Sequence, residues 1–239
     1  MKQVQWVNFQ TFIGEVAVLN TKVKTDSLLF RGQPCSKPLL PKIARHLPHI
    51  NSTELERGML LELRRQGSRF PEVIGKSDLD LLAIAQHHGM ATRLLDWSTN
   101  PLVALWFACS EFATSESAHL SIYKGATDVI LNPGAESDPF CYAVTRIFQP
   151  AHNNARVVAQ SGWFSIHPFY AQLEFKALDE DVIHFLWVYH LEIPAAEKIS
   201  IISYLDILGI NHRSLFPDID GLCRHISWQH SAKWPANAF

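Results

Sequence analysis

Runs of apolar positions with helical spacing or helical end signals predict five helices along the chain. The predicted helices are 54–66, 79–88, 101–113, 200–208 and 220–229. The third of them is apolar nearly all round, so we expect it to be deeply buried. The residues that predict helix ends are Thr53 with Glu56 as a capping box, Asp78 and Asn100 as N-caps, Pro101 as a first residue, and Gly89 and Gly209 as stops.

Short runs rich in aromatic and β-branched residues predict the strands of a mixed sheet. The predicted strands are 27–32, 120–123, 129–131, 143–148 and 185–193. Gly32 and Pro34 stop the first run, so this strand is expected to carry Arg31 at its end. Segment 92–98 is expected to be a loop that leads into the buried third helix. Together these elements predict an α+β fold with a single domain and helices that flank the sheet.

Composition and charge narrow the class of protein. Of the 239 residues, 47% are apolar and 18% are charged, which is typical of a globular domain with a substantial core. The net charge of −2 gives no strong overall attraction to nucleic acid or to an anionic membrane. This overall value does not exclude a basic cleft on one part of the surface. The four cysteines are far apart, which favours reduced thiols over a zinc site or disulfides. Without a signal-like start or an apolar run of about 18 residues, we expect a cytoplasmic protein with no membrane partner.

Candidate chemistry is concentrated in segment 86–101, where polar, ionisable and aromatic residues crowd between two apolar helices. The chain lacks the signatures of a phosphate loop, a dinucleotide-binding turn, a zinc protease and a nucleophile elbow. A plain connector does not need Arg93, Asp96 and Trp97 together. We therefore expect this segment to line a binding or catalytic site.

Several motifs, in order along the chain, resemble the FRG domain family. They are Phe30-Arg31-Gly32, LLPKIAR at 39–45, AQHHGMATRLLDWS at 85–98 with Asn100-Pro101, ALWFA at 104–108, RVVAQSGWF at 156–164 and LFPDIDGL at 215–222. On these motifs the chain is identified as a member of that family, with a helical lead-in at 1–26, the FRG domain at 27–228 and a C-terminal tail at 229–239. The resemblance implies a bacterial or phage protein linked to defence or toxicity, with an antitoxin or defence partner.

A second layout is similar to the R-S-E arrangement of ADP-ribosyltransferases: an arginine at an early strand, a Ser/Thr segment before an aromatic helix, and a later Gln-x-Glu. The corresponding residues here are Arg31, Ser98-Thr99 and Gln172-Leu173-Glu174. This similarity implies an ADP-ribosyltransferase-like fold and a nucleotide-using, NAD-consuming enzyme that modifies a protein or nucleic-acid target. NAD is then the expected cofactor, and no metal is predicted.

The similarity implies a role for each of these residues. Arg31 would bind the phosphates or ribose of a dinucleotide, and Ser98 would orient the nicotinamide ribose. An acid would stabilise the positive charge that develops as nicotinamide leaves. Glu174 fits the layout least well, and the alternative carboxylates are Asp96, Asp218 and Asp220.

Other residues are expected to contact the ligand. Gly32 would permit close approach by an anion, Trp97 would stack on a ring, and Gln160 would present its amide. The expected ligand-binding residues are Arg31, Gly32, His88, Thr92, Arg93, Trp97 and Gln160, and the expected catalytic residues are Arg31, Asp96, Ser98 and Glu174.

Each prediction has a structural alternative. Arg31 could form a salt bridge, Trp97 could belong to the core, and Arg93 could simply pair with Asp96. His88 could interact with the negative end of its helix. Two other functions also stay open. One is a non-catalytic module that recognises a nucleotide, a nucleic acid or a phage protein, and the other is a nuclease, which needs a metal held by Asp96, Asp218, Asp220 and His88.

Overall fold

A computed structural model describes residues 2–21, 28–111, 115–125, 129–131, 138–151, 154–171, 174–181, 183–184 and 187–231. Its strands are β1 (Lys2–Gln5), β2 (Leu28–Gln33), β3 (Leu94–Ser98), β4 (Ala118–Lys124), β5 (Arg146–Phe148), β6 (Gly162–Ile166) and β7 (Val188–Ile193). Its α-helices are α1 (Phe9–Thr21), α2 (Thr53–Gln66), α3 (Asp78–His87), α4 (Pro101–Cys109), α5 (Ala155–Ala159), α6 (Lys198–Ile207), α7 (His212–Leu215) and α8 (Ile219–Ser231).

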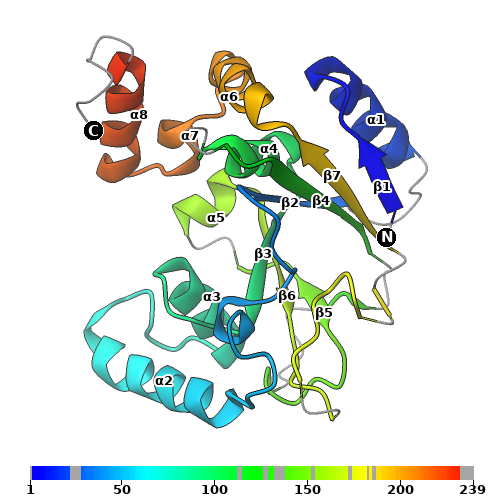
Figure 1. The fold of residues 1–239 in the computed structure, drawn as a ribbon. Coiled ribbons are helices and arrows are strands. Elements are labelled where there is room, and N and C mark those ends of the chain that lie inside the picture. Colours follow the sequence, from blue (N-terminus) through cyan, green and yellow to red (C-terminus); the bar gives the residue numbers. More distant parts are fainter. Residues whose placement is uncertain are drawn as a thin grey trace.

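Within the described residues, seven strands form one sheet in the order β1-β7-β4-β2-β3-β6-β5 (Figure 1). β1 pairs with β7 in parallel, and the remaining pairs are antiparallel. The predicted α+β fold, with a mixed sheet and flanking helices, is confirmed.

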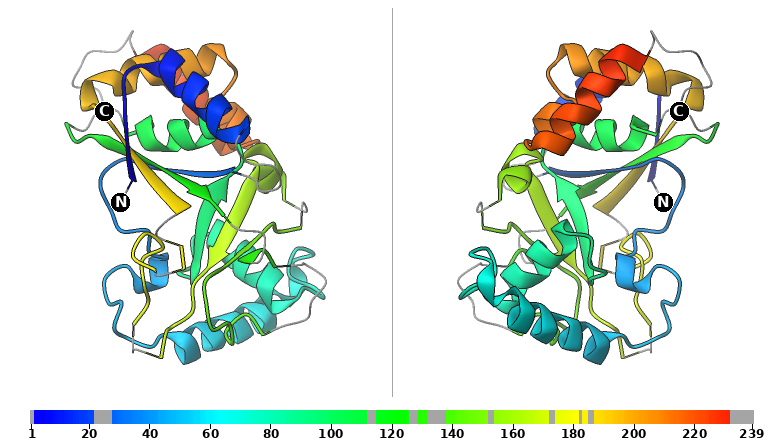
Figure 2. Two further views of the ribbon diagram at one scale, coloured as in Figure 1. Left: turned by 90° about the vertical axis from the view of Figure 1, so that its right-hand side faces the viewer. Right: turned by 90° about the vertical axis from the view of Figure 1, so that its left-hand side faces the viewer.

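The sheet opens between β2 and β3. These two strands share a single register pair, Phe30 with Ser98. β2 otherwise pairs with β4 over six residues, and β3 pairs with β6 over five. The sheet therefore has two parts, and both views in Figure 2 place α1, α4, α6 and α8 at one end of the molecule and α2 and α3 at the other.

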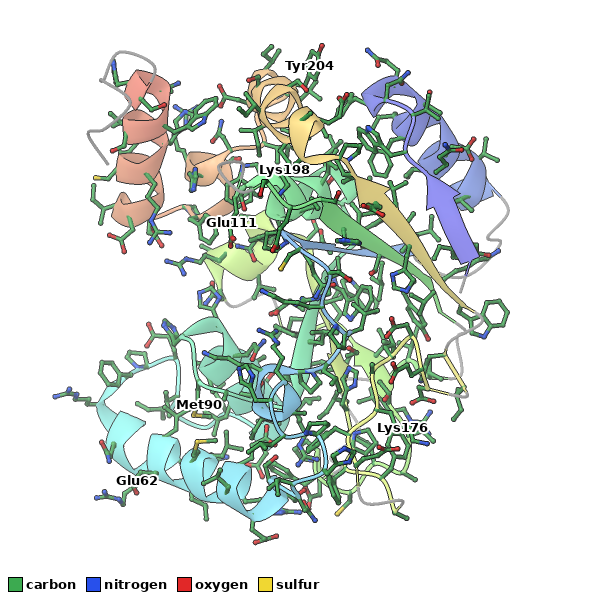
Figure 3. The ribbon with its side chains drawn as sticks, viewed as in Figure 1. Glu62, Met90, Glu111, Lys176, Lys198 and Tyr204 are labelled. Carbon is green, nitrogen blue, oxygen red and sulfur yellow. The ribbon has the colours of Figure 1, made fainter. Side chains whose placement is uncertain are left out.

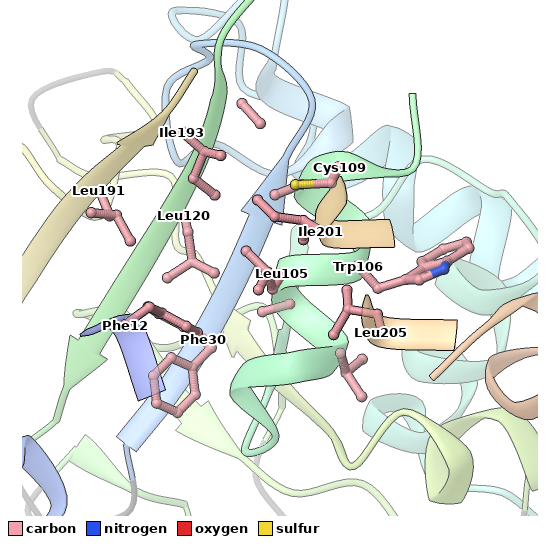
Figure 4. Close-up of a cluster of buried hydrophobic side chains, with 14 of the residues drawn as sticks. Phe12, Phe30, Leu105, Trp106, Cys109, Leu120, Leu191, Ile193, Ile201 and Leu205 are labelled. Carbon is pink, nitrogen blue, oxygen red and sulfur yellow. The ribbon is translucent and has the colours of Figure 1, made fainter. Parts of the chain in front are cut away.

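The first core packs α4 against β2, β4 and β7 (Figure 4). Its members come from the strands and from α1, α4 and α6, and they include Phe12, Phe30, Leu105, Trp106, Leu120, Leu191, Ile201 and Leu205. Six residues of α4 are buried, which confirms the prediction for this apolar helix. A Cβ atom at Gly32 would come within 1.8 Å of the Ala104 carbonyl oxygen, so β2 and α4 approach each other at a distance that only glycine permits.

A buried lysine ties the end of this core together. Lys198, the first residue of α6, is fully buried, and its Nζ donates to the carbonyl oxygens of Pro34 and Glu111 at 3.2 and 3.5 Å. Figure 3 shows Lys198 and Glu111 close to each other above the sheet. These bonds join α6 to the segment after β2 and to the segment after α4.

The second core lies beneath α2 and α3. Leu60 of α2 and Leu81 and Leu82 of α3 pack with Leu94 of β3 and Phe164 of β6. Phe140 of this core lies against the guanidinium of Arg93, which pairs with Glu56, and both charged residues are fully buried. This packing places β3 on the inner side of α3.

Several predicted helix ends are confirmed. Gly89 and Gly209 have φ angles of 89° and 81°, the left-handed conformation that ends a helix. The side chain of Asn100 accepts a hydrogen bond from the Leu102 amide at 2.9 Å and caps α4. The predicted third helix extends further, but α4 ends at Cys109, and residues 112–113 lie outside the described residues.

Four local predictions are wrong. Segment 92–98 is not a loop, because Leu94–Ser98 forms β3, and segment 129–131 contributes only an isolated bridge at Ile130. Ser77 caps α3 instead of Asp78, since its hydroxyl accepts a bond from the Asp80 amide. The capping box at Thr53 and Glu56 does not form, because Ser52 is the N-cap and the Glu56 carboxylate binds Arg93 instead.

None of the helices in the described part of the chain combines the length and the apolar character needed to cross a membrane. The four cysteines are free.

Candidate functional site

A pocket of about 310 Å³ lies where β2 and β3 separate. Side chains from β2, α3, β3, α4 and α5 line it, together with Phe216 from the segment before α8. Its polar and charged lining residues are Arg31, Gln86, His87, Asp96, Ser98, Arg156 and Gln160. Its aromatic lining residues are Phe30, Trp97, Phe107 and Phe216. A flat ring and a charged group could both find partners in such a pocket.

Arg31 crosses the opening between the two strands. Its Nη1 donates to the backbone carbonyl oxygen of Asp96 at 2.7 Å and lies 3.6 Å from the Asp96 carboxylate. The Nε atom is buried, and no described residue accepts a hydrogen bond from it. Burial lowers the pKa of Arg31, and nearby Arg45 acts in the same direction while Asp96 opposes it. The guanidinium keeps its charge at neutral pH, because the pKa of arginine starts above 12.

Asp96 presents its carboxylate to the pocket. The side chain is 56% exposed, although the strand around it is buried. Gln86 of α3 donates from Nε2 to the carboxylate at 3.1 Å, and its own amide oxygen accepts from the Thr92 hydroxyl at 2.8 Å. A fixed but accessible carboxylate can stabilise a cation or accept a proton.

Trp97 and Ser98 are held in place by bonds inside the protein. The Trp97 indole donates to the Ser165 hydroxyl at 3.0 Å, and the ring is 97% buried. The Ser98 hydroxyl donates to the Gln160 carbonyl oxygen at 2.7 Å and accepts from the Asn100 amide at 3.0 Å. Both residues therefore shape the wall of the pocket.

Two contacts tie α5 and the residue after it to the far wall of the pocket. The Gln160 side chain donates to the Leu215 carbonyl oxygen at 3.1 Å. Arg156 binds the carboxylate of Asp218 through Nε at 2.9 Å and also through Nη2, and its guanidinium lies 5.3 Å from the centre of the Phe216 ring. These contacts hold Phe216 at the edge of the pocket.

The comparisons with known proteins give one result. Residues 26–117 match the family model of the FRG domain. This segment belongs to the FRG domain family. No curated protein and no solved structure matches the chain. The similarity to ADP-ribosyltransferases therefore rests on the residues alone, and the extension of the domain to residue 228 stays a prediction.

The FRG segment supplies β2, α3, β3 and α4, and with them most of the pocket. The match leaves out Arg156, Gln160 and Phe216, which complete its far wall. Arg156 and Phe216 occur in the motifs at 156–164 and 215–222, but neither is among the expected site residues. Their presence in those motifs was the one available signal, because no spacing rule links α5 to a segment more than fifty residues later.

The pocket brings together Arg31, Asp96, Trp97, Ser98 and Gln160 from the expected site residues. Gly32 also lines it, but the close approach that needs a glycine there is made by the backbone of α4 and not by an anion.

Four expected site residues do not line this pocket. Thr92 and Arg93 are fully buried, and Arg93 pairs with Glu56 and not with Asp96. His88 is exposed, and its neighbour His87 lines the pocket in its place. Glu174 lies 3.7 Å from His49 on another surface, while Gln172 and Leu173 lie outside the described residues.

The residues that a metal-dependent nuclease would need lie apart. Asp218 binds Arg156, and its other carboxylate oxygen accepts from the Gly221 amide at 2.9 Å at the start of α8. This arrangement matches the capping role of an acidic turn. Among the described residues, no three His, Cys, Asp or Glu side chains gather as they would around a metal ion.

Proposed function

We propose that the pocket binds a dinucleotide, NAD⁺, and that the protein breaks the bond between its nicotinamide and ribose. One observation carries this proposal: a charged arginine and an accessible carboxylate, Arg31 and Asp96, line one pocket with aromatic walls. Arg31 offers donors for a phosphate or a ribose hydroxyl, and its buried Nε is still without an acceptor among the described residues. Phe107 and Phe216 offer apolar contacts for a flat ring.

Asp96 takes the role of the acid in this proposal. Breakage of the glycosidic bond sends its electron pair to the nicotinamide nitrogen and leaves positive charge on the ribose. A carboxylate close to that carbon stabilises the charge before a nucleophile adds. Asp96 is suited to this role because its carboxylate faces the pocket, whereas Glu174 lies on another surface.

Ser98 has a supporting part in this site. Its hydroxyl is already bonded to Gln160 and Asn100, so it is available to a ligand only if these bonds are given up. We assign it the positioning of Gln160 and of the start of α4.

A second candidate is a recognition module that binds the same ligand without changing it. The internal bonds of Ser98 and Gln160 favour this candidate, because they occupy polar groups that a catalytic site would otherwise direct at its substrate. The two candidates differ in one measurable quantity, the release of nicotinamide.

The experiment compares the purified wild-type protein with Arg31→Ala and Asp96→Asn in the presence of NAD⁺ and cell lysate. Released nicotinamide and bound ADP-ribose are quantified, and NAD⁺ binding is measured by calorimetry. Arg65→Ala and Asp220→Asn are the matched controls, because both residues are exposed and lie outside the pocket. Circular dichroism and thermal unfolding show whether each variant is folded.

We expect the wild type and both controls to release nicotinamide, Arg31→Ala to lose binding, and Asp96→Asn to bind NAD⁺ but release little. Binding without release by the wild type supports the recognition module. Absence of binding contradicts both candidates. NAD⁺ loss in a host cell would be toxic, in keeping with the defence setting and the antitoxin partner that the FRG resemblance implies.

A further inference from the structure

His87 is a pocket residue whose ring has no assigned task. It is the last residue of α3, and its partly buried ring lines the same pocket as Asp96. No described residue forms a hydrogen bond with the ring, whose neighbour His88 meets it edge-on at 5.0 Å between centroids. A ring that is accessible from the pocket and free of internal bonds can meet a substrate.

The surroundings of His87 favour its neutral form. Burial lowers its pKa, and the positive charges of His88 and Arg156 add to this effect, while Asp96 and Asp218 oppose it. His87 also lines a second, smaller pocket together with Asp80. The titratable and charged groups around the ring are therefore Arg31 on β2, Asp80 and His88 on α3, Asp96 on β3, Arg156 on α5, and Asp218 before α8. A neutral imidazole has a nitrogen lone pair that accepts a proton at pH 7.

We infer that His87 is the general base of the proposed reaction and that the acceptor attacks through a hydroxyl oxygen. This inference rests on the proposed function. The acceptor oxygen forms a bond to the ribose carbon, and the proton of its O–H group moves to the free nitrogen of His87. The bond from that carbon to the nicotinamide nitrogen breaks, its electron pair returns to the ring, and neutral nicotinamide leaves.

The weakness of this base selects the acceptor. A lysine ammonium or an arginine guanidinium must lose a strongly held proton before it can attack, and an imidazole is a much weaker base than either side chain and is too weak to remove it. A carboxylate acceptor already carries a free lone pair, so a base at His87 would have no part in its attack. A hydroxyl already carries lone pairs and becomes acidic only as its new bond forms, so a weak base is sufficient.

The test compares the wild type with His87→Gln over pH 5 to 9, with nicotinamide release as the first readout. His119→Gln is the matched control, because His119 is also partly buried with a lowered pKa but lies on β4 outside the pocket. We expect His87→Gln to lower kcat by about 100-fold, in the range that general bases contribute, with KM for NAD⁺ nearly unchanged. The wild-type rate should rise with pH through the pKa of His87, and this rise should be absent from the variant.

The activity measured with added imidazole distinguishes a general base from a residue that has only a structural role. We expect added imidazole to restore activity to His87→Ala, in which the missing ring leaves space for it, and to have no effect on the wild type or on His119→Ala. Mass spectrometry of the products separates the two sources of the hydroxyl, because water gives free ADP-ribose and another acceptor gives a conjugate.

The outcomes separate this inference from the function on which it rests. If the wild type releases no nicotinamide, the proposed function fails and the inference fails with it. If the wild type is active and His87→Gln keeps its rate and its pH profile, only the inference is overturned. A conjugate through a lysine, arginine or carboxylate side chain would likewise overturn it.

Discussion

Arg93 and Glu56 form an ion pair that is closed off from water. Arg93 Nε lies 2.7 Å from the Glu56 carboxylate, which also accepts from the Arg93 backbone amide at 2.7 Å. Arg93 Nη2 donates to the Thr53 hydroxyl at 3.0 Å, and the guanidinium lies 4.5 Å from the centre of the Phe140 ring. This pair fixes the start of β3 against α2, three residues before Asp96.

Loss of the carboxylate of this pair should strongly destabilise the fold. Glu56→Ala leaves Arg93 buried with no compensating charge, which typically costs about 3–5 kcal/mol. Urea unfolding of the purified variant measures the change in the free energy of unfolding. Glu62→Ala on the same helix is the control, and its effect should be far smaller because Glu62 is half exposed. A loss similar to that of the control would contradict the structural role of the pair.

Gly32 should tolerate no side chain. Gly32→Ala would place Cβ 1.8 Å from the Ala104 carbonyl oxygen and 2.5 Å from the Ala108 amide nitrogen, and neither backbone atom can move without displacing α4. We expect a loss of more than about 3 kcal/mol in the free energy of unfolding. Gly58→Ala in the middle of α2 meets no atom within 4 Å and should raise it by about 0.5–1 kcal/mol. Equal effects of the two substitutions would contradict this explanation.

Local sequence signals were sufficient to predict much of the fold. Gly89, Asn100 and Gly209 predicted helix ends from their own backbone preferences and side chains, and the apolar composition of residues 102–109 predicted a buried helix. Such features depend on residues only a few positions away in the chain, so a local sequence pattern is enough to predict them.

Features that depend on distant partners were missed. The spacing of Thr53 and Glu56 matches a capping box, but the charge of Arg93, 37 residues beyond Glu56, is a stronger partner than the helix end. The strand at 94–98 was not predicted, because it does not alternate between apolar and polar positions. Asp96 is the one exposed position in an otherwise buried strand. In the site, His87 and His88 are adjacent in sequence, so the pattern does not show which ring faces the pocket. His87 is the last residue of α3 and lines the pocket, whereas His88 follows the helix.

Ser98 should prove more important for stability than for chemistry. Ser98→Ala removes one bond to the Gln160 carbonyl oxygen and one from the Asn100 amide, and loss of both should cost about 1–3 kcal/mol. Nicotinamide release per folded molecule should change only a few-fold. Ser110→Ala, at the other end of α4, removes a single long bond to Phe107 and serves as the control. A fully folded Ser98→Ala protein without activity would instead assign Ser98 a direct catalytic role.

His167 should make the protein sensitive to acid. Its ring is completely buried, and Nδ1 carries the hydrogen, because the Lys176 carbonyl oxygen 3.4 Å away can only accept. Nε2 of the neutral ring therefore accepts from the Ser165 hydroxyl at 2.9 Å, and the Ser165 oxygen accepts in turn from the Trp97 indole. Burial of this neutral ring lowers the pKa of His167 from 6.5 to about 4.

The sign of the pH effect follows from this lowered pKa. Between pH 6.5 and about 4, the unfolded chain binds a proton at His167 and the folded protein does not, so the free energy of unfolding falls as the pH falls. The full difference amounts to about 3 kcal/mol and is absent above pH 7. His167→Gln keeps a donor and an acceptor without a titrating ring, so its unfolding free energy should fall less over this range. The measurement is urea unfolding at several pH values, with His230→Gln as the control because His230 is exposed. An identical decline in the wild type and His167→Gln would show that other groups control the response to acid.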